Sequence, residues 1–210
     1  MAYASPDTAR CLPVSGGVVR RPPQLAGWAG GLLFVVCIGW LGTVYMAIWK
    51  KFECWTYEHF DRDIEPAALP GFEDLVRLWQ DKRGDRVVPS WSDFDFYDFK
   101  GWHGRIGVYD ISYDPFDYTC RLSGVEIDRV YDQTMTGAKG SDLTKIEVDN
   151  IASMEFNEMI CRQMLISRKS GPLNYKGREH VKATFVEFPL SDDGLKATHT
   201  LESLFSRSTT

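Results

Sequence analysis

The sequence predicts an α+β domain, built on an antiparallel sheet, that follows a single transmembrane helix. Two observations predict this arrangement. Residues 25–49 contain no charged side chain, and after residue 72 the pattern runs through an amphipathic helix, two β-rich runs, a long helix and three further β-rich runs. Because β-rich runs joined by short turns pair as antiparallel neighbours, the later runs predict one antiparallel sheet.

The uncharged stretch 25–49 predicts a membrane span. As a helix it reaches roughly 37 Å at ~1.5 Å per residue, and a bilayer core is about 30 Å thick. It is longer than the apolar core of a cleaved signal peptide, which favours a permanent anchor. Gly27 and Gly31 form a G-x-x-x-G spacing that permits close packing of a second helix, although glycine is common in spans. The residues expected at the membrane interface are Trp28, Trp49, Lys50, Lys51 and Trp55.

The segments beside this stretch are expected to lie outside the folded core. Residues 1–24 predict a flexible tail, and residues 206–210 a second short tail. Residues 50–71 predict a juxtamembrane segment, in which the helix continues along the headgroups before Pro66, followed by a linker. Basic residues balance across the span, so charge alone does not decide its orientation.

Composition excludes one class of partner and favours a compartment. Of the 24 basic and 29 acidic residues, 19 and 28 lie after residue 51, a net charge of −9 that excludes a nucleic-acid-binding surface. The five cysteines are scattered without metal-binding or disulfide spacing, which favours reduced thiols on the cytoplasmic face of an inner membrane. These cysteines are Cys11, Cys37, Cys54, Cys120 and Cys161.

Residues 72–205 predict the folded domain. Phe72, Leu75, Val76 and Trp79 form the stripe of an amphipathic helix that Gly84 ends. The remaining pattern has a hairpin turn at Asp114-Pro115, short helical pieces, and a turn at 191–194. The expected strands are 105–112, 116–123, 173–175, 180–188 and 195–205, and the expected long helix is 151–168.

Two strands, a helical crossover and three antiparallel strands resemble a PAS domain, in particular a proteobacterial family of small single-domain PAS-like proteins. The resemblance covers residues 72–205. It implies a five-stranded antiparallel sheet with helices on one face and a pocket between them. The segments that carry it are 79–84 (WQDKRG), 89–95 (PSWSDFD), 106–111 (IGVYDI), 118–124 (YTCRLSG), 134–140 (TMTGAKG), 175–178 (YKGR) and 188–194 (FPLSDDG).

The pocket implied by the resemblance leaves room for a small ligand, and a filled core is the alternative. The residues expected to surround the pocket are Tyr118, Tyr131, Met135, Phe156, Met159 and Ile160. Arg121 or Arg178 is expected to supply a cation. No cofactor is expected, because helix 151–168 lacks a histidine for haem, and Ile160 replaces the asparagine of the photoactive flavin motif before Cys161. No metal site is expected either.

No constellation of nucleophile and base appears, so the chain is expected not to be an enzyme. The sequence therefore predicts a membrane-anchored sensory or regulatory module that acts through a protein partner or a homodimer. The alternative is a non-catalytic accessory or assembly subunit of a larger membrane complex.

Overall fold

The computed structural model describes residues 46–52, 55–143, 150–173 and 181–208. All of them belong to the unit Leu33–Thr210. Residues 25–45 of the expected membrane span lie outside the described residues. This range includes Gly27, Trp28 and Gly31. The last four residues of that span, 46–49, belong to a strand. The described helices include none with the length and apolar character that a membrane crossing requires.

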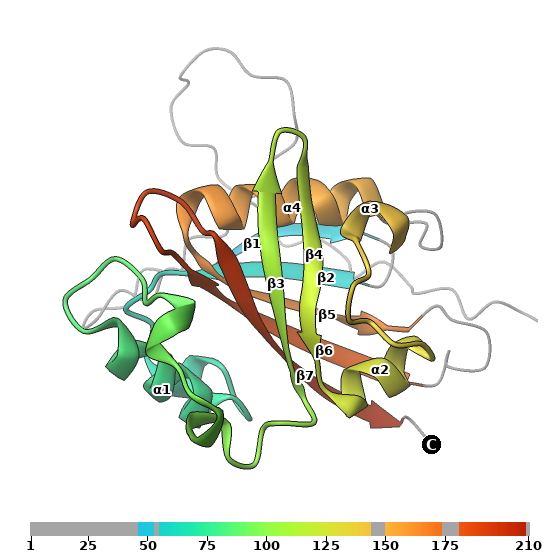
Figure 1. The fold of residues 1–210 in the computed structure, drawn as a ribbon. Helices are drawn as coiled ribbons and strands as arrows, with labels where there is room; N and C mark the ends of the chain where they lie inside the picture. Colours follow the sequence, from blue (N-terminus) through green and yellow to red (C-terminus); the bar gives the residue numbers. More distant parts are fainter. Residues whose placement is uncertain (1–45, 53–54, 144–149, 174–180, 209–210) are drawn as a thin grey trace, which may run out of the picture. The chain divides into compact units, whose positions relative to one another are not determined.

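The described chain forms an α+β fold around one antiparallel sheet of seven strands, as Figure 1 shows. Six of the strands lie beyond residue 54. Their order across the sheet is β1-β2-β5-β6-β7-β3-β4. The strands are β1 (Met46–Phe52), β2 (Trp55–Phe60), β3 (Ile106–Tyr113), β4 (Phe116–Ser123), β5 (Ile166–Pro172), β6 (Val181–Leu190) and β7 (His199–Ser208).

The α+β class and the antiparallel sheet are confirmed, but the expected number of five strands is too small. β3 to β7 form a continuous five-stranded part, and β2 and β1 extend it beyond β5. The expected helix along the headgroups is wrong, because residues 46–52 and 55–60 form these two strands. β2 pairs with β5 and buries Tyr57 and Phe60, so these two aromatic residues of the expected juxtamembrane segment pack within the protein.

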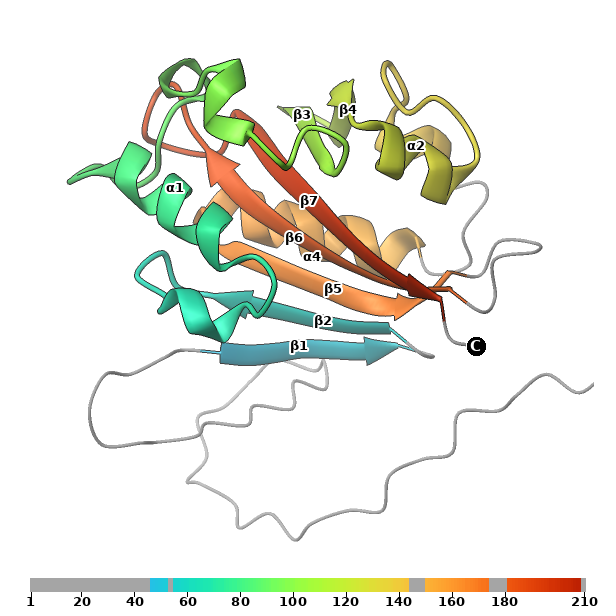
Figure 2. The same cartoon turned by 90° about the horizontal axis from the view of Figure 1, so that it is seen from below.

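Helices cover both faces of the sheet, which corrects the expectation of helices on one face. Figure 2 shows α1 (Glu73–Arg83) on one side and α4 (Asn150–Gln163) on the other. With α4 lie α2 (Val125–Tyr131) and α3 (Gly140–Leu143), and with α1 lie short 3-10 turns. These turns are η1 (Pro66–Ala68), η2 (Trp91–Asp93) and η3 (Phe96–Phe99).

The predicted amphipathic stripe of α1 is confirmed. Leu75, Val76 and Trp79 are fully buried, and Trp79 Nε1 donates to the carbonyl oxygen of Pro189 at 3.0 Å. The Trp79 ring also packs against Phe188, with ring centroids 6.1 Å apart. Burial of these side chains against β6 fixes α1 to the sheet, because each buried large apolar side chain contributes about 2 kcal/mol.

The long helix ends earlier than predicted. α4 stops at Gln163, Met164 adopts a positive φ of 51°, and β5 then runs from Ile166 to Pro172. The expected strand 173–175 therefore lies beyond the end of β5. A non-glycine residue in the left-handed region is uncommon, so no glycine or proline marks this helix end in the sequence.

Candidate functional site

A cavity of about 60 Å³ lies between the sheet and helices α2 and α4. Side chains from all five strands β3 to β7 reach it. One part of its wall is aromatic and apolar, made by Tyr109, Ile111, Phe116, Tyr118, Tyr131 and Met135. The other part is polar, made by Ser153, Asn157, Lys169, Glu187, Thr200 and Glu202. The cavity is thus an amphipathic pocket, lined by both charged groups and aromatic rings.

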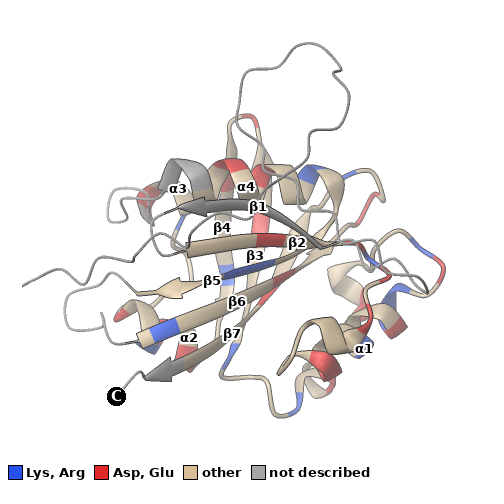
Figure 3. Ribbon diagram, turned by 180° about the vertical axis from the view of Figure 1, so that it is seen from behind, with Lys and Arg blue, Asp and Glu red and all other residues tan. Residues whose placement is uncertain are grey.

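The charged side chains come together because of strand register. Glu187 on β6 lies directly opposite Glu202 on β7 and opposite Ser167 on β5. Ser167 and Lys169 are two residues apart on β5 and therefore point to the same face. Neighbouring strands thus place one lysine and two glutamates on the face that carries α4. Charged residues of both signs lie side by side across β2, β5 and β6 in Figure 3.

Lys169 is bound to one of the two glutamates. Its Nζ donates to Glu187 Oε1, and at 3.3 Å to Asn157 Oδ1 on α4. Ser167 Oγ donates to the other oxygen of Glu187 at 3.1 Å. Burial lowers the pKa of Lys169, but the charges of Glu187 and Glu202 outweigh this and raise the pKa above its usual value. Lys169 is therefore a permanently charged group beneath the pocket.

Glu202 has a different environment. Tyr109 donates its hydroxyl to Glu202 Oε1 at 2.9 Å, and the Glu202 and Glu187 side chains also hydrogen-bond. Burial is the largest effect and the charge of Glu187 the next, and together they raise the pKa of Glu202 to about 8, against a lowering by Lys169. Burial and the neighbouring carboxyl group therefore favour a protonated Glu202 at neutral pH.

Three of the eight expected ligand-binding residues line this cavity: Tyr118, Tyr131 and Met135. Arg121 does not line it, because its guanidinium pairs with Asp110 at 2.7 Å and both side chains are well exposed. Arg178 lies outside the described residues.

The expected residues on α4 face a neighbouring cluster instead. Phe156 and Ile160 are fully buried with Tyr57 of β2, and Met159 packs against the same cluster. The Phe156 and Tyr57 rings meet edge-on with centroids 5.3 Å apart. The unpredicted strand β2 thus covers the apolar stripe of α4, and the adjoining stripe, Ser153, Asn157 and Cys161, faces the cavity.

The charged residues of the site were missed because each lies within a β-rich or helical run. Glu187 and Glu202 occupy positions that face inward, between apolar neighbours such as Val186 and Leu201. A charge at an inward position of a buried strand is rare, so strict alternation along 181–190 and 199–208 could have identified both glutamates.

Four of the five residues expected at the membrane interface lie in described strands. Trp49, Lys50 and Lys51 lie in β1, and Trp55 begins β2. The Trp55 ring stacks on Phe185 with centroids 6.2 Å apart, within the sheet. Packing accounts for Trp55 without a membrane, and its expected interfacial role stays a prediction.

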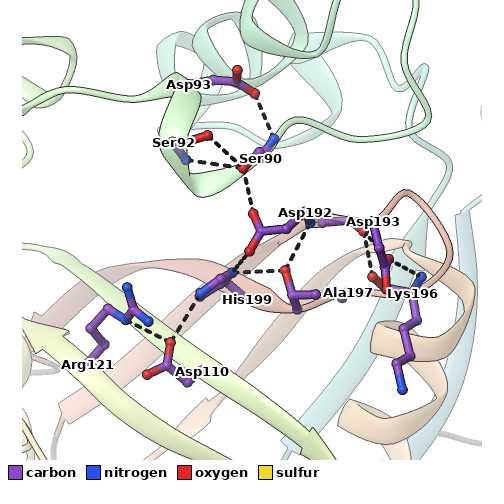
Figure 4. Close-up of polar contacts among 12 residues, drawn as sticks. Ser90, Ser92, Asp93, Asp110, Arg121, Asp192, Asp193, Lys196, Ala197 and His199 are labelled. Atoms are coloured by element: carbon purple, nitrogen blue, oxygen red, sulfur yellow. Dashed lines mark hydrogen bonds and ion pairs between the residues drawn. The ribbon is translucent and has the colours of Figure 1, made fainter.

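A second polar cluster lies on the opposite face of the sheet and is centred on His199, as Figure 4 shows. His199 Nε2 lies 3.3 Å from Asp110 Oδ1, and its Nδ1 lies 3.6 Å from Asp192 Oδ2. Ser90 donates to Asp192 Oδ1 at 2.5 Å. Ser90 therefore contacts the carboxylate and not the imidazole, which is unlike a nucleophile with its base. The cluster connects the segment around Ser90 to the β6–β7 turn.

The two described cysteines are free and buried. Burial raises the pKa of the Cys120 thiol to about 12 and raises that of Cys161 further. Both are unreactive thiols at neutral pH, in keeping with the expectation of reduced cysteines. Cys11, Cys37 and Cys54 lie outside the described residues.

Comparison of the chain with protein-family models, with curated proteins and with solved structures finds no match. The site is therefore interpreted from its own geometry.

Proposed function

We propose that this chain is a membrane-anchored, PAS-type regulatory module that binds a small ligand in the cavity and acts through a protein partner. The observation that carries the proposal is the cavity itself, with Lys169, Glu187 and Glu202 on its polar side. A buried ion pair contributes little to stability compared with apolar residues of the same volume. Polar groups that converge on a cavity are therefore better explained by recognition than by folding.

The order of elements supports the PAS-type assignment. From β3 onwards the chain has two strands, a helical crossover through α2, α3 and α4, and three antiparallel strands, all in one sheet. The cavity lies between that sheet and the crossover helices, which is where the resemblance of the sequence to PAS domains places a ligand pocket.

The membrane anchor is proposed from the sequence. Residues 46–49 belong to β1, which leaves the uncharged residues 25–45 for the span. As a helix these reach roughly 31 Å at ~1.5 Å per residue, still enough for a hydrocarbon core of about 30 Å. We place the domain on the cytoplasmic face of the inner membrane, and the partner with it.

The test is native purification of the full chain in mild detergent, followed by native mass spectrometry. A free monomer or dimer that carries a stoichiometric small molecule supports the proposal. A large stoichiometric complex without a small molecule supports an accessory subunit instead. Protease treatment of intact spheroplasts tests the location, since a cytoplasmic domain is cleaved only after the membrane is opened.

A further inference from the structure

Among the described residues that line the cavity, negative groups outnumber positive ones. Lys169 is the cation beneath it, and its ammonium group is bound by Glu187 and Asn157. Glu202 receives a hydrogen bond from Tyr109, which is neutral, and lies beside a second carboxyl group. Glu202 is 4 % exposed. A carboxylate buried at this depth needs a positive partner, and without one burial and the charge of Glu187 raise its pKa and favour the protonated form.

We infer that the cavity takes a small alkylammonium ion, whose nitrogen lies against Glu202 and whose alkyl groups contact the tyrosine rings. This inference rests on the proposed function, and it names the class of ligand. The ligand cation takes the place of the proton, so the carboxyl pair becomes fully ionised around two positive charges, those of Lys169 and of the ligand.

The aromatic wall suits such a cation. Tyr109, Tyr118 and Tyr131 all line the cavity, and the rings of Tyr109 and Tyr118 meet edge-on with centroids 5.7 Å apart. A desolvated cation over an aromatic face gains about 2 kcal/mol, and alkylammonium groups are bound by aromatic rings in this way. The rings also exclude water, which strengthens the attraction to Glu202.

An anionic ligand fits these residues poorly. It would have to compete with Glu187 for Lys169 and would enter a space that already holds two carboxyl groups. Like charges in a buried site disfavour each other by several kcal/mol. A neutral ligand would leave the proton on Glu202 and would gain only apolar contacts with the tyrosines.

The volume limits the size of the ion. A water site needs about 15 Å³ of such space, so a cavity of about 60 Å³ holds roughly four non-hydrogen atoms. Trimethylammonium matches this size and keeps one N–H donor for a carboxylate.

Exchange of a proton for the cation gives the inference a specific signature. The titratable groups that face Glu202 from the elements around it are Tyr109, Tyr118, Cys120, Tyr131, Cys161, Lys169 and Glu187. Burial raises the pKa values of Tyr109, Cys120 and Cys161, so none of these three titrates near neutral pH. Binding should therefore release about one proton. At pH values below the pKa of Glu202, affinity for the cation should increase about tenfold for each unit by which the pH is raised.

The experiment is calorimetric titration of the full chain in detergent micelles at pH 6.5 with trimethylammonium chloride. 2-Propanol and sodium acetate, which have as many non-hydrogen atoms, are the neutral and anionic probes. We expect saturable binding of trimethylammonium alone. Repeating the titration in buffers of different ionisation enthalpy should show release of about one proton.

The matched variants are Glu202→Gln and Glu155→Gln, since Glu155 is exposed on α4 and the substitution is the same. Glu202→Gln should weaken binding at least about tenfold, and Glu155→Gln should leave it unchanged. If Glu202→Gln does not fold, Tyr131→Leu should weaken binding about fivefold through loss of the ring.

The other outcomes overturn either the cationic ligand alone or the proposed ligand-binding function as well. Binding of acetate or 2-propanol in preference to trimethylammonium, or a co-purified anion, overturns the cationic ligand but supports the pocket. The inference is also overturned if the Glu202→Gln variant binds trimethylammonium as tightly as the natural chain does. It is overturned as well if binding releases no proton. Absence of binding by every probe, with no co-purified small molecule, overturns both the inference and the proposed ligand function.

Discussion

Glu187 and Glu202 lie directly opposite each other on adjacent strands, and Lys169 is bonded to Glu187. Directly opposed like charges destabilise a pair of strands. The sheet accommodates the pair because Tyr109 donates to Glu202, and because burial and the charge of Glu187 raise the pKa of Glu202 and so favour its protonated form. The pair can therefore exchange a proton for another positive charge without any change in strand register.

The first prediction concerns pH and stability. The pKa of Glu202 is about 8 in the folded chain and 4.5 in its ordinary range, so between these values the folded state binds the proton and the unfolded state does not. This contribution to stability is fully present below about pH 4.5 and is lost as the pH rises to about 8. The loss should amount to a few kcal/mol and should be absent in Glu202→Gln. Urea unfolding of the full chain in micelles from pH 5 to pH 9 measures it.

Histidines have the opposite effect and must be separated from it. Burial lowers the pKa values of His59 and His199, so their effect reduces stability as the pH falls below about 6.5. Subtracting the curve of Glu202→Gln from that of the natural chain removes this effect. A difference that does not change between pH 5 and pH 9 would contradict the protonation of Glu202.

The second prediction concerns the ion pair of Lys169 and Glu187. Lys169→Met should destabilise the chain by about 3 kcal/mol, because it leaves the buried Glu187 without its cation. Lys169→Met combined with Glu187→Leu should recover much of this loss, since an apolar pair replaces the ion pair. Denaturation of the two single variants and the double variant measures the coupling, and strictly additive effects would show that the two groups do not interact.

The third prediction concerns the close approach of β2 to β5. A Cβ on Gly171 would lie 2.5 Å from Cδ2 of the Trp55 ring. Gly171→Ala should therefore cost about 2 kcal/mol and speed amide hydrogen exchange in Trp55–Phe60. In a Trp55→Ala background the same change should cost much less. An equal cost in both backgrounds would show that the ring is not the obstacle.

The fourth prediction concerns the His199 cluster. Asp192→Ala removes the acceptor of the Ser90 hydroxyl and should loosen the segment 84–104 from the β6–β7 turn, at a cost of about 1 kcal/mol. Limited proteolysis should then cut that segment several times faster. Asp81→Ala, at an exposed position on α1, is the control for loss of charge and should leave the cleavage rate as it is.

Local pattern predicted those elements whose partners are near in sequence. The stripe from Phe72 to Trp79 predicted α1, and the hairpin turn at Asp114-Pro115 predicted the pairing of β3 with β4. The regions 180–188 and 195–205 correspond to β6 and β7, which pair along their whole length. Helical spacing of apolar residues predicted α1, and β-rich runs bounded by turn residues predicted the strands.

The strands β2 and β5 could not be predicted in the same way. β5 has the sequence ISRKSGP, in which polar residues predominate, and it is nonetheless an interior strand of the sheet. Arg168 pairs with Glu58 at 2.6 Å on one face, and Lys169 pairs with Glu187 on the other. These partners lie far away in the sequence, so the charges look like surface residues until the fold brings them together.

The dependence on partners that are far away in the sequence also explains why the pocket was predicted only in part. Tyr118, Tyr131 and Met135 come from segments whose fold was predicted, and they line the cavity. Phe156 and Ile160 were expected there because they form the apolar stripe of α4, which in fact covers β2. Alternation along the strands marks Glu187 and Glu202 as facing inward, but it does not show that they lie opposite each other beside Lys169. That arrangement depends on the register across β5, β6 and β7.

The position of β1 and β2 in the sheet has a mechanical consequence. The chain leaves the uncharged stretch 25–45 and enters β1 directly, and β1, β2 and β5 are consecutive neighbours joined by backbone hydrogen bonds. A force on the N-terminal segment would therefore act through these ladders up to the strand that carries Lys169. The floor of the cavity is thus connected to that segment by hydrogen-bonded strands, so tension on the N-terminal segment and occupancy of the cavity act on the same strand.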